Sequence, residues 1–211
     1  MCLILVAWQA HPAYPLVVAA NRDEFFKRRT ASADFWPDHP QVLAGRDLEA
    51  GGTWLGITRT GRFAALTNFR DPASHKPAAP SRGALVAAFL TGTAGIDACL
   101  DGLEPARYNG FNLLLGERRR LVAFSNVTGQ RHELAPGVYG LSNALLDTPW
   151  PKVGAGKTAL SAALDALPDE TALFRLLSDT TIHPDTALPA TGVPLEWERL
   201  LSAAFIRGTD Y

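Results

Sequence analysis

The chain begins MCLILVAWQAHPAYPLVVAANRDE over residues 1–24, two apolar runs separated by a Pro-rich segment. The runs at 1–8 and 16–20 predict two buried strands joined by a turn at 11–15. Chain ends normally lie loose at the protein surface. A first strand that is buried therefore indicates that the beginning of the chain is itself a working part.

Cys2 becomes the first residue when the initiator methionine is removed, and its small side chain permits that removal. A terminal cysteine carries a thiol and an α-amine with an unperturbed pKa of about 8. Because the amine can accept the thiol proton, one residue supplies both nucleophile and base, as in N-terminal nucleophile catalysis. The alternative is an inert core cysteine, the usual role of a lone thiol among apolar residues.

Composition limits the classes of protein to consider. The 211 residues are 47% apolar and 19% charged, which predicts one domain with a well-filled core. A net charge of -1 gives no electrostatic case for binding nucleic acid. Cys2 and Cys99 form neither a metal-ligand pattern nor a disulfide framework, so a reducing, cytoplasmic location is expected. Neither a signal peptide nor a run of about 18 apolar residues is visible, so no membrane span is expected.

The rest of the chain predicts strands first and helices later. A loop is expected at 30–40, and Ser81 is the expected N-cap of the first helix. Further strands are predicted at 53–58, 63–67, 111–115, 121–125, 130–134 and 137–143. Helices are predicted at 81–90, 96–103, 157–167, 170–178 and 195–203. This distribution indicates an α+β layered domain dominated by antiparallel sheet.

Polar residues follow the second apolar run directly. Side chains alternate along a strand, so Asn21 and Asp23 are expected on one face and Arg22 and Glu24 on the other. If this strand pairs with the strand of Cys2, Asp23 would lie near the terminal amine and hold it. The alternative is a surface ion pair between Arg22 and a neighbouring acid, which contributes little stability.

Two asparagines, Asn68 and Asn143, each end an apolar strand. An amide at such a position can donate to the oxyanion of a tetrahedral intermediate. Asparagine at the end of a strand is also a common turn residue. The catalytic interpretation therefore requires the two side chains to converge.

Two other motifs carry less weight. Residues 154–158 resemble a phosphate-binding loop, but the glycine that this motif requires falls on Pro151, and we reject it. The histidines have no spacing typical of metal ligands. Each could serve as an axial ligand of a haem iron, although an exposed loop position is the simpler interpretation. They are His11, His39, His75, His132 and His183.

Several stretches together resemble the NRDE family, also called the Transport and Golgi organisation 2 family. The likeness extends over essentially the whole chain, and its motifs are residues 21–24, 52–56, 66–70, 81–83, 108–113, 140–143 and 148–152. The resemblance implies a four-layer αββα sandwich of antiparallel sheets, similar to N-terminal nucleophile hydrolases. Cys2 stands where those enzymes carry their nucleophile.

The resemblance also implies roles for individual residues. Conjugated bile acid hydrolases and penicillin V acylases are the nearest enzymes by this likeness, and Asp23 matches their aspartate that orients the terminal amine. Asn143 matches the asparagine that supports the oxyanion, and Asn68 is expected to act with it. The arginine of the pattern falls on Ala20, so its role is vacant unless Arg22 substitutes.

The family usually continues past Tyr211 into Gly-Thr-Arg and further strands, so a truncated or shortened member is expected. Two classes of function stay open. The first is a cysteine amidohydrolase acting on a small non-peptide amide, which needs no cofactor. The second is a non-enzymatic protein that binds and carries haem, acyl-CoA or a lipid, since family members are linked to haem mobilisation and lipid metabolism. A structural remnant with neither role is a third alternative.

Overall fold

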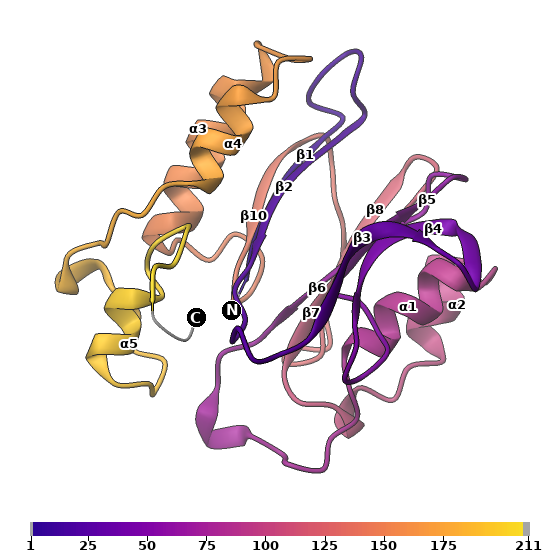
Figure 1. The fold of residues 1–211 in the computed structure, drawn as a ribbon, viewed down its shortest axis with the longest axis horizontal. Coiled ribbons are helices and arrows are strands. Elements are labelled where there is room, and N and C mark those ends of the chain that lie inside the picture. The colour runs from indigo at the N-terminus through magenta and orange to yellow at the C-terminus, as the bar shows by residue number, and fades with distance from the viewer. Residues whose placement is uncertain (1, 209–211) are drawn as a thin grey trace. The chain divides into compact units, whose positions relative to one another are not determined.

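The computed structural model describes residues 2–208 (Figure 1). The predicted removal of Met1 and the expectation for the chain beyond Tyr211 both concern residues outside this range. Contacts between Cα atoms divide the chain into two compact units, each with its own sheet and helices. Unit 1 comprises Met1–Phe25, Asn68–Ala73 and Ala135–Tyr211, and unit 2 comprises Phe26–Thr67 and Ser74–Leu134. The prediction of a single domain over residues 1–211 stays a prediction.

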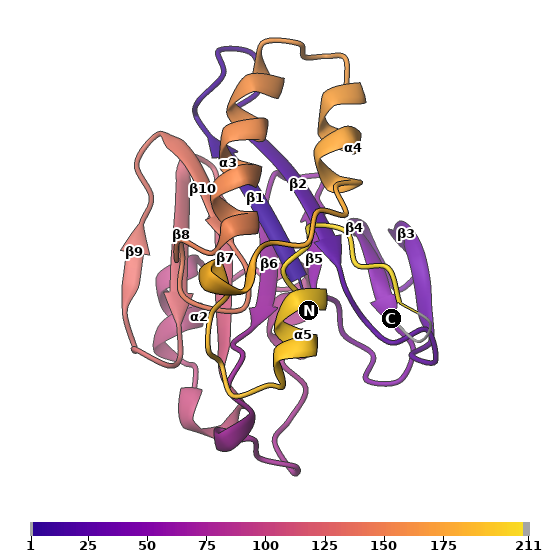
Figure 2. The ribbon, with the colours of Figure 1, turned by 90° about the vertical axis from the view of Figure 1, so that its left-hand side faces the viewer.

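Unit 1 is built on an antiparallel sheet in the order β10-β1-β2. Its strands are β1 (Cys2–Trp8), β2 (Leu16–Arg22) and β10 (Gly137–Leu141). The helices are α3 (Pro151–Leu164), α4 (Thr171–Leu177), α5 (Leu195–Leu200) and the short 3-10 turn Asp185–Ala187. A further 3-10 turn, Pro72–Ser74, has its first two residues in this unit. In Figure 2, α3 and α4 lie over this sheet, where α3 contacts β1 and β10 and α4 contacts β2.

The first strand is buried as the sequence predicted. Alternate residues of β1, Leu3, Leu5 and Ala7, belong to the same core cluster as Leu160 of α3. Since side chains alternate along a strand, the side chain of Cys2 lies on the face of the sheet opposite these helices.

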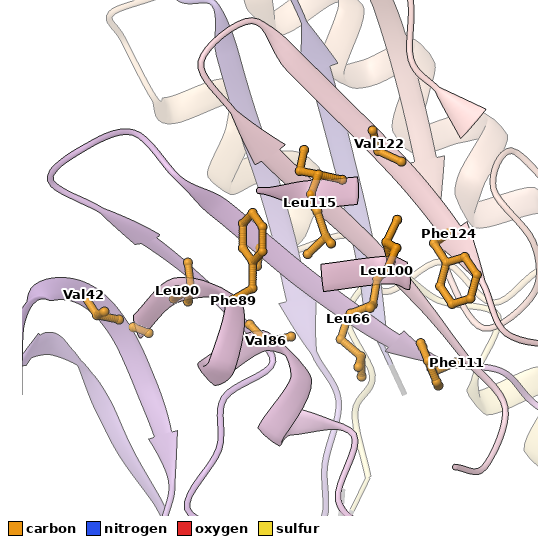
Figure 3. Packing of buried hydrophobic residues seen from close by; sticks show 14 of the residues in the cluster. Val42, Leu66, Val86, Phe89, Leu90, Leu100, Phe111, Leu115, Val122 and Phe124 are labelled. Atoms are coloured by element: carbon orange, nitrogen blue, oxygen red, sulfur yellow. The ribbon is translucent and has the colours of Figure 1, made fainter. Parts of the chain in front are cut away.

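Unit 2 holds a seven-stranded sheet in the order β3-β4-β5-β6-β7-β8-β9. Its strands are β3 (Thr30–Trp36), β4 (His39–Asp47), β5 (Leu55–Thr58), β6 (Phe63–Asn68), β7 (Phe111–Glu117), β8 (Arg120–Ser125) and β9 (Arg131–Glu133). Two helices pack on it, α1 (Gly83–Thr91) and α2 (Ile96–Asp101), and a 3-10 turn covers Pro105–Arg107. Figure 3 shows the core of this unit, in which side chains of α1 and α2 meet those of the sheet.

Several family motifs in unit 2 hold backbone segments together. A Cβ atom at Gly52 would lie 2.5 Å from the carbonyl carbon of Gly83, so only glycine permits this close approach. The N–H of Thr53 donates to the carbonyl of Gly83 (3.2 Å), and the Arg82 guanidinium donates to the carbonyl of Gly110 (3.0 Å). These motifs therefore have a structural explanation within unit 2.

The predicted loop at 30–40 is wrong, because β3 and the start of β4 occupy most of it. β3 is an edge strand, and every one of its residues except Trp36 is exposed. An edge strand of this kind has no buried face, so the alternation of apolar and polar residues that reveals a strand is missing.

Two helix starts also differ from prediction. α3 begins at Pro151, six residues before the predicted start, because proline is well suited to the first turn of a helix. Ser81 is not the N-cap of α1, since Arg82 occupies that position without a capping side-chain hydrogen bond. The predicted fold class, α+β with antiparallel sheets, is confirmed.

Candidate functional site

Ends of several elements meet at one end of the sheet of unit 1. β1 begins at Cys2, and β2 ends at Arg22, the residue that pairs with it. β10 ends at Leu141, which pairs with Ile4, so the chain leaves β10 beside the beginning of β1. α3 starts ten residues later and runs back over the same sheet.

The side chain of Asn143 connects three backbone segments at this end. Its Oδ1 accepts the backbone N–H of Cys2 (3.3 Å), and its Nδ2 donates to the carbonyl of Asn68 (2.8 Å). Its own carbonyl accepts the N–H of Arg70 (2.7 Å), and the Ser142 hydroxyl donates to the carbonyl of Cys2 (2.9 Å). Asn143 is only 1% exposed, so its position is fixed on all sides.

This network brings Asn68 and Asn143 together with Cys2. The two side-chain amides do not both present donors, as an oxyanion site would require. Asn143 presents its acceptor to the nitrogen of Cys2 and uses its donor on Asn68, which contributes its backbone carbonyl. An oxyanion requires a donor, so the predicted oxyanion role of Asn143 requires Nδ2 to leave that carbonyl. The oxyanion roles of both asparagines stay predictions.

Cys2 itself is half-buried, and burial raises the pKa of its thiol. The positive charge of the N-terminus opposes this rise most strongly, and the backbone N–H of Asp23 and the charge of Arg22 oppose it less. The carboxylate of Asp23 adds to the rise. A thiol in this setting is not a spontaneous thiolate, so its chemistry depends on a base within reach.

Arg22 is the residue of β2 that pairs with Cys2 on the neighbouring strand β1. Its guanidinium forms an ion pair with Glu24 at 3.4 Å. The ion pair considered as the alternative for Arg22 is therefore formed. Because β2 ends at Arg22, the predicted alternation of faces does not extend to Asp23. Asn21 has a structural function: its Nδ2 donates to the carbonyls of Leu177 (2.7 Å) and Ala204 (2.8 Å).

Asp23 is half-buried, and its carboxylate interacts electrostatically with the thiol of Cys2. Burial raises the pKa of Asp23 from 3.8 to about 6, and the positive charges of Lys152, the N-terminus and Arg70 act against that rise. At neutral pH the carboxyl group is therefore still mostly ionised. It is placed to interact with a cation at the start of β1.

Lys152 is the residue of this site to which the sequence assigned no role. It lies in the first turn of α3 and is 2% exposed. Burial lowers the pKa of Lys152 to about 8, with Asp23 and Cys2 favouring its charge and Arg70 opposing it. A lysine in the first turn of a helix opposes the helix dipole. This unfavourable position of Lys152 can be recognised from the sequence only when the start of α3 is predicted correctly.

Arg70 is buried beside this cluster and pairs with Glu198 of α5 at 2.5 Å. Its guanidinium carbon lies 4.7 Å from the ring centroid of Trp150, and Glu198 also accepts the N–H and hydroxyl of Thr191. Arg70, Trp150, Lys152 and Glu198 line a cavity of about 10 Å³. A cavity of this volume holds about one water molecule.

The histidines, for which an exposed position was the simpler interpretation and haem ligation the alternative, lie at or near the surface. All five histidines are exposed or half-buried. Nδ1 of His11 accepts the N–H of Ala13, a local contact within a loop. Within residues 2–208, no three side chains of His, Cys, Asp or Glu gather closely enough to hold a metal ion. Over the same range, every helix is too short or too polar to cross a membrane.

Comparison with known proteins gives the family and the fold. The sequence model of the family described as Transport and Golgi organisation 2 matches residues 1–211. The Bos taurus protein named Transport and Golgi organization protein 2 homolog is 41% identical over 214 residues, covering 91% of this chain and 77% of its own. The Homo sapiens homolog is 39% identical over 207 residues, covering 90% and 74%.

Among solved structures, the Caenorhabditis elegans ortholog of N-acylethanolamine-hydrolyzing acid amidase superposes with a TM-score of 0.56 at 12% identity. The superposition covers 84% of this chain and 86% of the other. It shows that the mixed α+β fold is similar to that of N-terminal nucleophile hydrolases, as the sequence predicted. By the match over its whole length, the chain belongs to the Transport and Golgi organisation 2 family.

Proposed function

We propose that this protein is a cysteine N-terminal nucleophile amidohydrolase that acts on a small non-peptide amide. The observation that carries the proposal is the hydrogen bond from the nitrogen of Cys2 to Oδ1 of the buried Asn143, beside the carboxyl group of Asp23. Once Met1 is removed, this nitrogen is the α-amine. An acceptor amide and a carboxylate then hold it next to the thiol of the same residue.

The proposed reaction proceeds through a thioester. The α-amine of Cys2 takes the thiol proton, and the sulfur attacks the carbonyl carbon of the substrate amide. The tetrahedral intermediate expels the amine product, which leaves with the proton from the α-ammonium group. A water molecule, deprotonated by the same amine, then hydrolyses the thioester and releases the carboxylic acid.

Each side chain has a proposed role in this sequence of steps. Asp23 stabilises the α-ammonium group by its charge, and Asn143 orients the amine by accepting its hydrogen. Donors for the oxyanion are proposed to come from Asn68 and from Nδ2 of Asn143 when substrate displaces its present contact. The fold likeness to an N-acylethanolamine-hydrolyzing acid amidase, at 12% identity, supports the scaffold of the proposed enzyme.

The state of the first residue tests the proposal most directly. We expect intact-mass spectrometry to show that the mature protein begins at Cys2. Retained Met1 would leave a peptide nitrogen in place of the base and would overturn the mechanism.

The two cysteines of the chain supply a matched pair for the activity test. Fluorogenic acyl amides of increasing chain length are the substrates, and release of the amine is the signal. We expect Cys2→Ala to abolish hydrolysis and Cys99→Ala to retain it, because Cys99 lies on α2 of unit 2. Equal turnover by Cys2→Ala and the unmodified protein would reject the proposal.

The second predicted function, binding of haem or an acyl ligand without catalysis, stays a prediction. Titration of the purified protein with haem, followed at the Soret band, tests it. No described residue favours it over hydrolysis, since the histidines lie at or near the surface.

A further inference from the structure

The feature that the proposed mechanism leaves unexplained is the burial of Lys152. Its residue is 2% exposed, and within residues 2–208 its Nζ has no hydrogen-bond partner. Removing an ammonium group from water costs several kcal/mol unless a partner compensates. The buried ammonium group of Lys152 therefore points to a function other than stabilising the fold.

The position of Lys152 on α3 makes the charge still more costly. It occupies the first turn, where the positive end of the helix dipole repels a cation. Its neighbours Val153 and Gly156 pack into the sheet of unit 1, against Gly140 and Leu5. An apolar side chain would therefore suit this position better than a lysine.

The packing of α3 also fixes where Lys152 points. Residues four apart lie on the same face of a helix, so Lys152 shares the face of Gly156, which packs against Leu5 of β1. A helical side chain extends toward the N-terminal end of its helix. Lys152 therefore reaches past Leu5 toward the end of the sheet where Cys2 and Asp23 lie.

Three positive charges act on Asp23. Lys152 of α3 acts most strongly, the charge of the N-terminus comes next, and Arg70 of the segment after β6 acts least. Arg70 is already paired with Glu198, whereas the charge of Lys152 interacts with those of Asp23, Arg70 and Cys2. Lys152 is thus a side-chain cation whose largest electrostatic interaction is with the Asp23 carboxylate.

We propose that Lys152 is a positioning residue that keeps the Asp23 carboxylate ionised beside Cys2, so that Asp23 can stabilise the protonated terminal amine. The inference rests on the proposed function. A neutral Asp23 would offer the amine no charge, and the proton would return to the thiol. Lys152 thereby acts on the reaction through Asp23, without touching the substrate.

The test compares Lys152→Met with Lys157→Met. Both lysines lie on α3, but Lys157 pairs at 2.8 Å with the half-buried Asp147. The side-chain carboxyl of Asp23 is followed by carbon-13 NMR against pH and identified by its absence in Asp23→Asn. We expect Lys152→Met to raise the apparent pKa of Asp23 by about one pH unit or more, the usual effect of an opposite charge nearby. Lys157→Met is expected to leave it unchanged.

The pH profile of amide hydrolysis provides the second measurement. In Lys152→Met, the acid limb of kcat/KM should move up by the same interval, and Lys152→Arg, which keeps the charge, should restore it. The melting temperature of Lys152→Met should equal or exceed that of the unmodified protein, which a merely structural lysine would not permit.

The outcomes separate the two proposals. If the unmodified protein hydrolyses no amide, the proposed function fails, yet the titration of Asp23 still tests the role of Lys152. An unchanged titration of Asp23 in Lys152→Met would overturn the inference. If Lys152→Met does not fold, the inference is also overturned, unless the polar variant Lys152→Gln folds and shows the expected shift.

Discussion

Asn143 is the residue on which the geometry at Cys2 depends. Its amide binds a donor on one side and an acceptor on the other, and both partners are backbone groups of other segments. The orientation of the amide follows from these partners, because an N–H must face the oxygen and a carbonyl must face the nitrogen. Loss of the side chain would leave both groups without their partner.

We expect Asn143→Ala to lower the free energy of unfolding by roughly 1–3 kcal/mol, the cost of leaving buried polar groups unsatisfied. Alkylation of the Cys2 thiol, measured in a Cys99→Ala background, should slow by about fivefold, the equivalent of one hydrogen bond of about 1 kcal/mol. Asn126→Ala is the matched control, since Asn126 makes a similar set of backbone contacts in unit 2. Equal effects of both variants on the thiol would contradict the prediction.

Asp23 gives the stability of the protein a distinct dependence on pH. Its folded pKa of about 6 lies above its ordinary value of 3.8. The folded state therefore binds the proton more tightly, and this stabilisation is present below pH 4 and lost as the pH rises through 6. The difference in unfolding free energy between the protein and Asp23→Asn should change across pH 4–6 by up to about 3 kcal/mol.

Chemical denaturation at a series of pH values measures that difference. Asp179→Asn is a control of opposite sign, because hydrogen bonds from Thr181 lower the pKa of Asp179. That carboxylate stabilises the folded state above its ordinary pKa and loses the effect as the pH falls. A flat difference curve for Asp23→Asn over pH 4–6 would contradict the assigned burial of its carboxyl group.

At the scale of elements, α3 packs closely on the sheet of unit 1. Two of its glycines differ sharply in their environment. A Cβ atom at Gly154 would meet no atom within 4 Å, whereas one at Gly156 would lie 2.8 Å from a methyl group of Leu5. Leu5 is fully buried, so it has little freedom to move away.

We expect Gly154→Ala to raise the free energy of unfolding by about 0.5–1 kcal/mol, the gain in helix propensity. Gly156→Ala has the same propensity gain, but overpacking against Leu5 should cancel or reverse it, at a cost of about 1–3 kcal/mol. Urea denaturation of the two variants measures the contrast. A stabilising Gly156→Ala would show that α3 lies farther from β1 than described.

At the scale of the whole chain, unit 1 is assembled from three stretches far apart in sequence. The ion pair of Arg70 and Glu198 joins the second stretch to the third, and both side chains are nearly inaccessible to solvent. A buried pair of this kind contributes little net stability against an apolar replacement. Removal of one partner is costly, because it leaves an uncompensated charge.

Glu198→Gln should therefore destabilise the protein by about 3–5 kcal/mol, measured by denaturant unfolding. Glu196→Gln is the matched control on the same helix, since Glu196 is exposed and its substitution should change stability by less than about 0.5 kcal/mol. Similar stability of the two variants would rule out a structural role for the pair.

How much of this could be predicted from the sequence depends on the range of the interactions. The apolar runs at the start of the chain predicted β1 and β2, because a buried strand is a local pattern of apolar side chains. The edge strand β3 escaped prediction because it buries almost nothing. The start of α3 was missed because two glycines weaken its helical pattern.

The sequence by itself determined most of the strands, the fold class, the family, and Cys2 as the candidate nucleophile. Only the tertiary structure decided that Asn143 presents an acceptor to Cys2 and that Lys152 is a buried cation beside Asp23. The physical reason is distance along the chain. A hydrogen bond or a charge interaction between residues more than 100 positions apart leaves no periodic trace in the sequence, and burial appears only when the elements pack.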